Sequence, residues 1–152
     1  MKKFSIIALL VICLLITGQA FAQKPGGQMG QDSSAPNMES IKDENLAEKE
    51  GTVILENLIE GLEKNNYEQF TRDFDEQMKK EVTREKFKEL QKDIMGRLGK
   101  MTNKTYLAAL QRTNYTILLW EGQFADFDGD ILLTLTLTRI ENKIKVAGFY
   151  FH

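Results

Sequence analysis

The chain has 152 residues, of which 42% are hydrophobic and 28% charged, and its formal net charge is −2 at pH 7. This length favours one domain, and the composition excludes both wholesale disorder and a polytopic membrane protein. The slight excess of acid is unlike the basic surface that nucleic-acid binding requires, so we expect no nucleic-acid partner.

The first 22 residues have the pattern of a bacterial secretory signal peptide. Lys2 and Lys3 precede an apolar run over residues 4–16, which is too short to cross a bilayer comfortably. Ala20-Phe21-Ala22 then supplies an A-x-A cleavage site. We therefore expect export to the periplasm or the outside of the cell, with no membrane anchor left after cleavage.

The only cysteine, Cys13, lies inside this apolar run. It has two interpretations: a lipoprotein cysteine that is acylated after cleavage, or part of the apolar run and nothing more. A lipoprotein site needs a small residue directly before the cysteine, and Ile12 is bulky, so the pattern favours the second. The mature chain then has no cysteine, and its stability must come from its core alone.

Residues 23–45 are predicted to be a disordered linker, and residues 46–152 to be the folded domain. The linker contains Pro25, Pro36 and the pair Gly26-Gly27 and lacks the apolar residues of a core. It is either a tether that holds the domain away from the envelope or a spacer without a role of its own.

Three helices are predicted next. The first runs from near Asp43 to near Lys64, with apolar residues at three- and four-residue spacing. Gly51 lowers the helix propensity inside it, which leaves a start after Gly51 as an alternative. Asn66 is then a candidate N-cap, with Gln69 in the capping-box position.

The second helix carries Tyr67, Phe70 and Phe74 on one face. The third begins after Thr83 and ends before Gly99. Beyond Gly99 the apolar period changes to two. Strands are predicted over residues 105–111, 115–124, 131–140 and 144–151.

Turns separate the predicted strands. They lie at residues 112–114, at residues 126–130, where Asp-Gly favours a hairpin, and at residues 141–143. Gly148 marks a candidate β-bulge. The predicted fold class is α+β, with three N-terminal helices packed on one face of a bent four-stranded antiparallel sheet.

This order of elements resembles the NTF2-like (cystatin-like, SnoaL-type) cone, and residues 53–151 are similar to the DUF3887 domain. The segments that carry the similarity are Asn66-Tyr67-Glu68-Gln69-Phe70, Phe74-Asp75-Glu76-Gln77-Met78, Leu98-Gly99, Trp120-Glu121-Gly122-Gln123-Phe124 and Lys145-Val146-Ala147-Gly148-Phe149. The resemblance implies a pocket between sheet and helices, and a dimer through the outer face of the sheet. It implies no reaction and no catalytic residues.

Aromatic side chains are the candidates for lining such a pocket. They are Tyr67, Phe70, Phe74, Tyr106, Trp120 and Tyr150. One interpretation makes them the core of a small domain without disulfides, and the other makes them the wall of a cavity for a small apolar ligand.

No catalytic set can be assembled from the sequence. The only histidine, His152, is the last residue, and Asp73 and Asp75 have a spacing that places them on different faces of a helix. The acidic run at residues 126–130 resembles the start of a calcium loop but lacks the later glycine and glutamate of an EF-hand. We expect no metal and no cofactor.

The leading hypothesis is an exported, non-catalytic module that binds a small ligand or a protein partner. Residues 117–120 are apolar on both faces of their strand, so a homodimer through the open sheet face would cover one of them. The alternatives are an isomerase, dehydratase or hydrolase that uses a buried carboxylate with Tyr67 or Tyr150, and a purely structural envelope domain.

Overall fold

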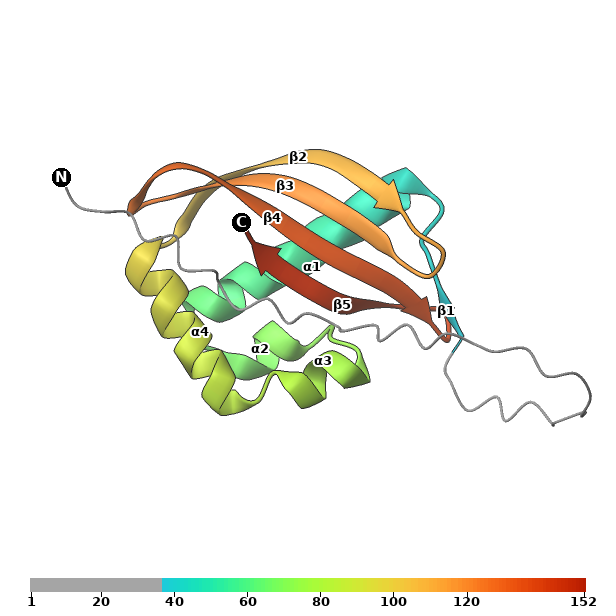
Figure 1. Ribbon diagram of the computed structural model, residues 1–152, viewed down its shortest axis with the longest axis horizontal. Coiled ribbons are helices and arrows are strands. Elements are labelled where there is room, and N and C mark those ends of the chain that lie inside the picture. Colours follow the sequence, from blue (N-terminus) through green and yellow to red (C-terminus); the bar gives the residue numbers. More distant parts are fainter. Residues whose placement is uncertain (1–36) are drawn as a thin grey trace, which may run out of the picture. The chain divides into compact units, whose positions relative to one another are not determined.

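A computed structural model describes residues 37–152 (Figure 1). The predicted signal peptide and the predicted linker up to residue 36 lie outside the described residues. The elements are β1 (Met38–Glu39), α1 (Glu44–Glu63), α2 (Tyr67–Thr71), α3 (Glu76–Glu81), α4 (Arg84–Arg97), β2 (Met101–Gln111), β3 (Thr116–Phe124), β4 (Phe127–Ile140) and β5 (Lys143–Phe151). This part of the chain is α+β, as predicted, with an antiparallel sheet that curls into a half-barrel.

Helix α1 begins and ends where its capping residues predict. The Asp43 carboxylate accepts the Leu46 amide at 3.1 Å. At the other end Asn65 has a φ of 51°, and the Asn66 amide donates to the Gly61 carbonyl at 2.8 Å. This left-handed residue and long backward bond make a Schellman-type end. The alternative start after Gly51 is wrong, because the helix continues through that residue.

Helix α2 begins at the predicted cap but is shorter than predicted. The Asn66 side chain accepts the Gln69 amide at 3.1 Å. The Gln69 side chain donates to Glu60 of α1 and not back to Asn66, so the capping box is only half formed. The helix ends at Thr71, and placing Phe74 on it was wrong.

The chain leaves α2 because its next backbone groups pair with the edge of β5. The Asp75 amide donates to the Val146 carbonyl at 2.9 Å, and the Val146 amide donates to the Asp73 carbonyl at 2.8 Å. These two bonds form a parallel bridge between Phe74 and Val146. They satisfy backbone groups that a longer helix would have paired internally.

Helix α3 was not predicted, so the described residues contain four helices and not three. The Asp75 carboxylate caps it by accepting the Met78 amide at 2.7 Å. Glu76 in the first turn and Lys79 and Lys80 in the last turn suit the helix dipole. Helix α4 follows its predicted cap, since the Thr83 hydroxyl accepts the Lys86 amide at 3.4 Å.

The four long strands form a meander in the order β2, β3, β4, β5, each antiparallel to the next. The β3–β4 turn is shorter than predicted, because Phe124 pairs with Phe127 and residues 127–130 belong to β4. The β4–β5 turn holds Glu141 and Asn142, both with positive φ, as a tight two-residue hairpin requires. Between Thr136 and Leu137 the register with β5 shifts by one residue, which confirms a bulge next to Gly148.

The end of the predicted linker is ordered, contrary to the expectation of disorder up to residue 45. Strand β1 pairs with Ile140 and Arg139 of β4. The Ile41 side chain is 1% exposed, and the Ile41 amide donates to the buried Thr116 hydroxyl at 2.8 Å. The Gln111 side chain donates to the Ile41 carbonyl at 2.9 Å. The sequence pattern missed this anchor because its two apolar residues, Met38 and Ile41, are too few among polar ones to show a period.

Changing Thr116 to valine is expected to lower the free energy of unfolding by about 1–3 kcal/mol, because the buried Ile41 amide would lose its partner. Urea unfolding measures the loss, and hydrogen exchange should show reduced protection of the Ile41 amide. Thr105, which is exposed on β2, provides the control as Thr105→Val. Equal losses from the two changes would show that the Thr116 hydroxyl does not hold this segment.

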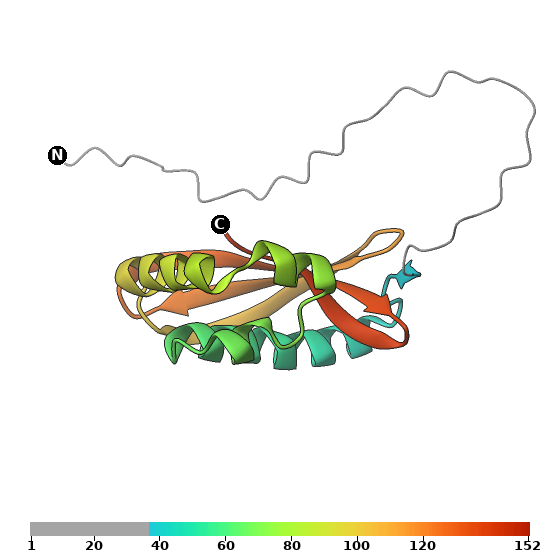
Figure 2. The same ribbon diagram turned by 90° about the horizontal axis from the view of Figure 1, so that it is seen from below.

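The core lies between the concave face of the sheet and the helices. In both views α1 runs lengthwise along the strands, and it contacts β2, β3 and β4 (Figures 1 and 2). Across the sheet, Leu118 faces Leu135 and Trp120 faces Leu133, and all four are buried. No helix within residues 37–152 is long and apolar enough to span a membrane.

Candidate functional site

The interior of the half-barrel is packed around aromatic rings. The rings of Phe70 and Phe74 have centroids 5.3 Å apart, and those of Phe70 and Phe87 are 5.1 Å apart. Tyr67 contacts Phe87 at 5.7 Å, edge to face, and its hydroxyl donates to the Val82 carbonyl. Phe70, Phe74 and Phe87 are all buried. At these positions the rings act as core residues, which was one of the two interpretations of the sequence.

A second aromatic pair lies under α1. Tyr106 and Trp120 contact each other at 5.6 Å, edge to face. The Tyr106 hydroxyl is buried without a hydrogen-bond partner among the described residues. Burial raises the pKa of this hydroxyl above its usual range, and the negative charges of Glu44 and Glu48 add to the effect.

Tyr150 lies on the other face of the sheet. Its neighbours Phe149 and Phe151 pack against the core, and successive residues of a strand point to opposite faces. Opposite Tyr150 on β4 is Thr134, which also points away from the core. The six aromatic candidates therefore do not line one cavity: five belong to or pack against the core between sheet and helices, and Tyr150 does not.

The other candidates from the sequence, which are Asp75, His152 and the acidic run at residues 126–130, take part in a helix cap or in the sheet. The Asp75 side chain is 9% exposed, and one of its oxygens caps α3. His152 pairs with Leu132 through both backbone groups. Within residues 37–152, no three histidine, cysteine, aspartate or glutamate side chains are grouped to hold a metal ion. Asp128 and Asp130 lie in strand β4 and not in a calcium loop.

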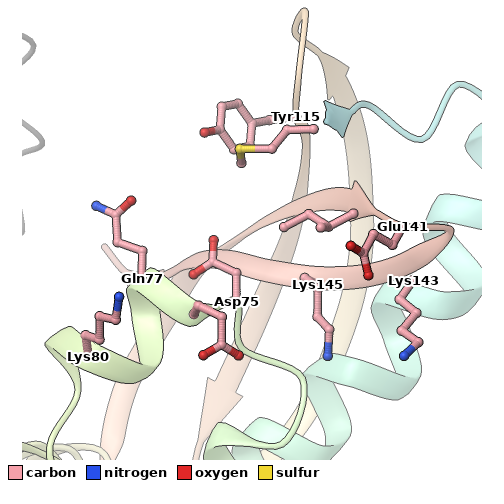
Figure 3. A pocket seen from close by; sticks show the side chains of 10 residues that line it. Asp75, Gln77, Lys80, Tyr115, Glu141, Lys143 and Lys145 are labelled. Atoms are coloured by element: carbon pink, nitrogen blue, oxygen red, sulfur yellow. The ribbon is translucent and has the colours of Figure 1, made fainter. Parts of the chain in front are cut away.

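A groove opens at the hairpin end of the sheet (Figure 3). Its volume is about 720 Å³, within the range of ligand-binding clefts. It is walled by α3, by the β4–β5 hairpin, by β1 and by the loop that precedes β3. The lining residues are Met38, Asp75, Glu76, Gln77, Lys80, Tyr115, Ile140, Glu141, Lys143 and Lys145.

The charged groups of this groove differ in whether they already form an ion pair or a hydrogen bond within the chain. Glu76 pairs with Lys79 at 3.3 Å, and Asp75 caps α3. Lys80, Lys143 and Lys145 form no ion pair with any described residue. The groove therefore carries an excess of unpaired positive charge.

Sequence reasoning did not find this groove, because most of its lining comes from segments that were predicted as linker, loop and turn, and only Tyr115, Ile140 and Lys145 come from predicted strands. Met38 was placed in the linker and Lys80 between two helices. One local signal was available: Asp75 followed by Glu76, with two lysines a turn later, is the pattern of a short capped helix. Which strand that helix would lie against is a tertiary property that no local pattern encodes.

The outer face of the sheet is a second candidate. We use "outer sheet face" for Leu110, Ile117, Leu119, Leu132 and Tyr150. In the sheet register Leu110 lies opposite Ile117, and Leu119 lies opposite Thr134, which in turn lies opposite Tyr150. Leu110 is 45% and Leu132 37% exposed. These residues make an apolar surface on the side of the sheet away from the core.

Comparisons with known proteins gave one result. The sequence profile of a family described as "Protein of unknown function (DUF3887)" matches residues 56–149, from the middle of α1 to the last strand. Neither a search of curated proteins nor a search of solved structures found a match. The matched segment covers more than half of the chain and includes the meander and helices α2 to α4, so the chain belongs to the DUF3887 family.

Proposed function

We propose that this chain is an exported, non-catalytic binding module that works as a homodimer joined through the outer sheet face. The observation that carries the proposal is the contrast between the two faces of the sheet. The concave face is filled by core side chains, whereas on the outer sheet face Leu110 and Leu132 are exposed and Ile117 and Leu119 are partly exposed. An exposed apolar surface of this kind usually marks an interface.

A second copy is the occupant that best fits this surface. A two-fold interface brings the same patch of both subunits together, so the apolar outer sheet face of one subunit would contact that of the other. Glu121 pairs across the sheet with Leu132 and therefore borders the outer sheet face. Thr134 and Thr136, between the apolar residues, are small enough to let two sheets approach closely.

Export is supported by the sequence of the first 22 residues: two lysines, an apolar run and an A-x-A site. The curled sheet, with α1 along its concave side, supports placing the domain among the NTF2-like cones. Binding is favoured over catalysis because the interior is packed with aromatic and aliphatic side chains. Asp75, the buried carboxylate available to an enzyme of this shape, has one oxygen occupied by the cap of α3.

Sedimentation equilibrium of the exported protein tests the dimer. We expect a dimer at micromolar concentration, and we expect Leu119→Lys to weaken it at least about tenfold by placing a charge inside an apolar contact. Val53→Lys is the matched control, because Val53 is an exposed apolar residue of α1 outside the outer sheet face. A wild-type protein that stays monomeric at high micromolar concentration would contradict the proposal.

A further inference from the structure

We propose that the groove between α3 and the β4–β5 hairpin binds an extended acidic segment of a protein partner. This inference rests on the binding function proposed above but not on the homodimer. It assigns a ligand chemistry to a part of the molecule that is separate from the filled interior. It follows from the spacing of the lysines, from the charge left unpaired in the groove and from its apolar lining.

The spacing of the lysines matches an extended peptide. Lys143 and Lys145 pair with Ile140 and Thr138 of β4 without a bulge between them, so their side chains share one face of β5. Figure 3 shows the two side chains extending in the same direction from the hairpin. Alternate residues of a strand lie about 7 Å apart, and alternate side chains of an extended peptide repeat at the same distance.

The charge in the groove favours an acidic ligand. Lys80 adds a third ammonium group from the wall that α3 forms. Of the three carboxylates in the lining, that of Glu76 forms an ion pair with Lys79. One oxygen of the Asp75 carboxylate accepts the backbone amide at the start of α3. Glu141 remains as the one carboxylate of the lining without a bond to a described residue. Asp75 keeps its negative charge while it caps α3, so three ammonium groups without an ion pair face two such carboxylates, Asp75 and Glu141. This excess of one positive charge makes the groove complementary to negative charge.

The groove also has an apolar part, formed by Met38, Tyr115 and Ile140. A segment that combines acidic with apolar residues would use both parts. The groove is walled by elements from four parts of the chain, and a segment in extended conformation can contact several of them at once. The chain's own residues 23–36 are a poor match, since they contain one acid, Asp32, together with Lys24. We therefore assign the groove to another protein.

Fluorescence anisotropy with a defined peptide tests the assignment. The probe is a fluorescein-labelled Ser-Glu-Leu-Glu-Leu-Ser peptide, titrated with the exported protein at low salt and compared with a peptide in which glutamine replaces both glutamates. We expect the acidic peptide to bind at least about tenfold more tightly than the glutamine peptide. Its affinity should fall about tenfold in the Lys143→Gln/Lys145→Gln double variant.

The matched control is Lys88→Gln/Lys92→Gln on α4, which removes the same charge from exposed lysines outside the groove. It should bind the peptide within about twofold of the wild type. Equal losses in the two double variants would mean general attraction between opposite charges and would overturn the assignment. No binding up to about 1 mM peptide would overturn it as well.

Competition with glutarate separates a protein segment from a small dicarboxylate. Displacement of the peptide by glutarate at a similar concentration would overturn the assignment to a protein partner, whereas weak competition supports it. Sedimentation of the same samples keeps the two proposals distinguishable. A dimer that fails to bind the peptide counts against the groove alone, and a monomer that binds it counts against the proposed dimer alone.

Discussion

Replacing Trp120 with alanine is expected to lower the free energy of unfolding by about 3–5 kcal/mol, the largest effect of any single change proposed for this protein. Trp120 is 1% exposed and lies on the concave face of the sheet, edge to face with Tyr106. Above it, α1 approaches at Gly51, where an added Cβ would lie 3.2 Å from the Trp120 ring. Removing the indole therefore leaves a cavity between a helix and a sheet that cannot easily close.

Urea unfolding followed by far-UV circular dichroism measures this loss, because Trp120 is the only tryptophan and its fluorescence disappears with the change. Wild type and variant must be compared at one protein concentration, since the proposed dimerisation would add to apparent stability. Val53→Ala, at an exposed position of α1, serves as the control and should change stability by less than about 1 kcal/mol.

The result also decides between the two interpretations of the aromatic residues. If the half-barrel is filled, added indole should raise the unfolding midpoint of Trp120→Ala, because an apolar cavity of suitable shape binds apolar rings. If the half-barrel holds an open pocket in solution, the loss should be below about 1.5 kcal/mol, because little packing surrounds the ring. The second outcome would support the interpretation that the aromatic residues line a cavity for a small apolar ligand.

The elements that sequence predicted well are those with complete local signals. Helix α1 combines an apolar stripe, the Asp43 cap and a left-handed Asn65, and each of these acts within a few residues. Strand β4 shows the two-residue period in its sequence, because one face is buried and the other is not. Each signal reflects a local energy term, so the sequence alone carries it.

The features that sequence missed depend on contacts between distant segments. Phe74 left its predicted helix because the backbone around it pairs with Val146, some seventy positions later. Ile41 is held by Thr116 across 75 positions. In both cases the tertiary hydrogen bond overrides the local preference. The groove was missed for the same reason, because its lysines come from α3 and from β5 and meet only in the folded chain.

Tyr150 shows a further limit of sequence reasoning. The aromatic residues Phe149, Tyr150 and Phe151 are consecutive, so composition alone does not say which of them face the core. The register with β4 decides it, and that register is shifted by the bulge beside Gly148. A candidate pocket drawn from aromatic residues without the register will therefore include residues of both faces.

The second large effect is expected where α1 and α2 approach most closely. An added Cβ at Gly61 would lie 2.7 Å from the Phe70 backbone nitrogen and 2.9 Å from its Cα. These are backbone atoms, so no side-chain rotation relieves the contact. The Gly61 carbonyl also accepts the Asn66 amide, which fixes the turn between the two helices. The glycine is therefore required by the close approach and not by the helix itself.

We expect Gly61→Ala to lower the free energy of unfolding by at least about 2 kcal/mol, since α2 must move and take Phe70 away from Phe74 and Phe87. Gly96→Ala provides the matched control, because Gly96 is also helical and an added Cβ there meets no atom within 4 Å. That control should gain up to about 1 kcal/mol from helix propensity alone. The difference between the two variants in urea unfolding measures the cost of the contact.

Opposite signs for Gly61→Ala and Gly96→Ala would establish that the α1–α2 approach is tight in solution and that the aromatic cluster depends on it. Similar gains in both variants would contradict this packing. The two helices would then have room to separate, and the cluster formed by Phe70, Phe74 and Phe87 would be a loose region of the fold. Because α2 leads directly into the segment that anchors α3 to β5, such looseness would extend to one wall of the groove and weaken the case for a preformed binding site there.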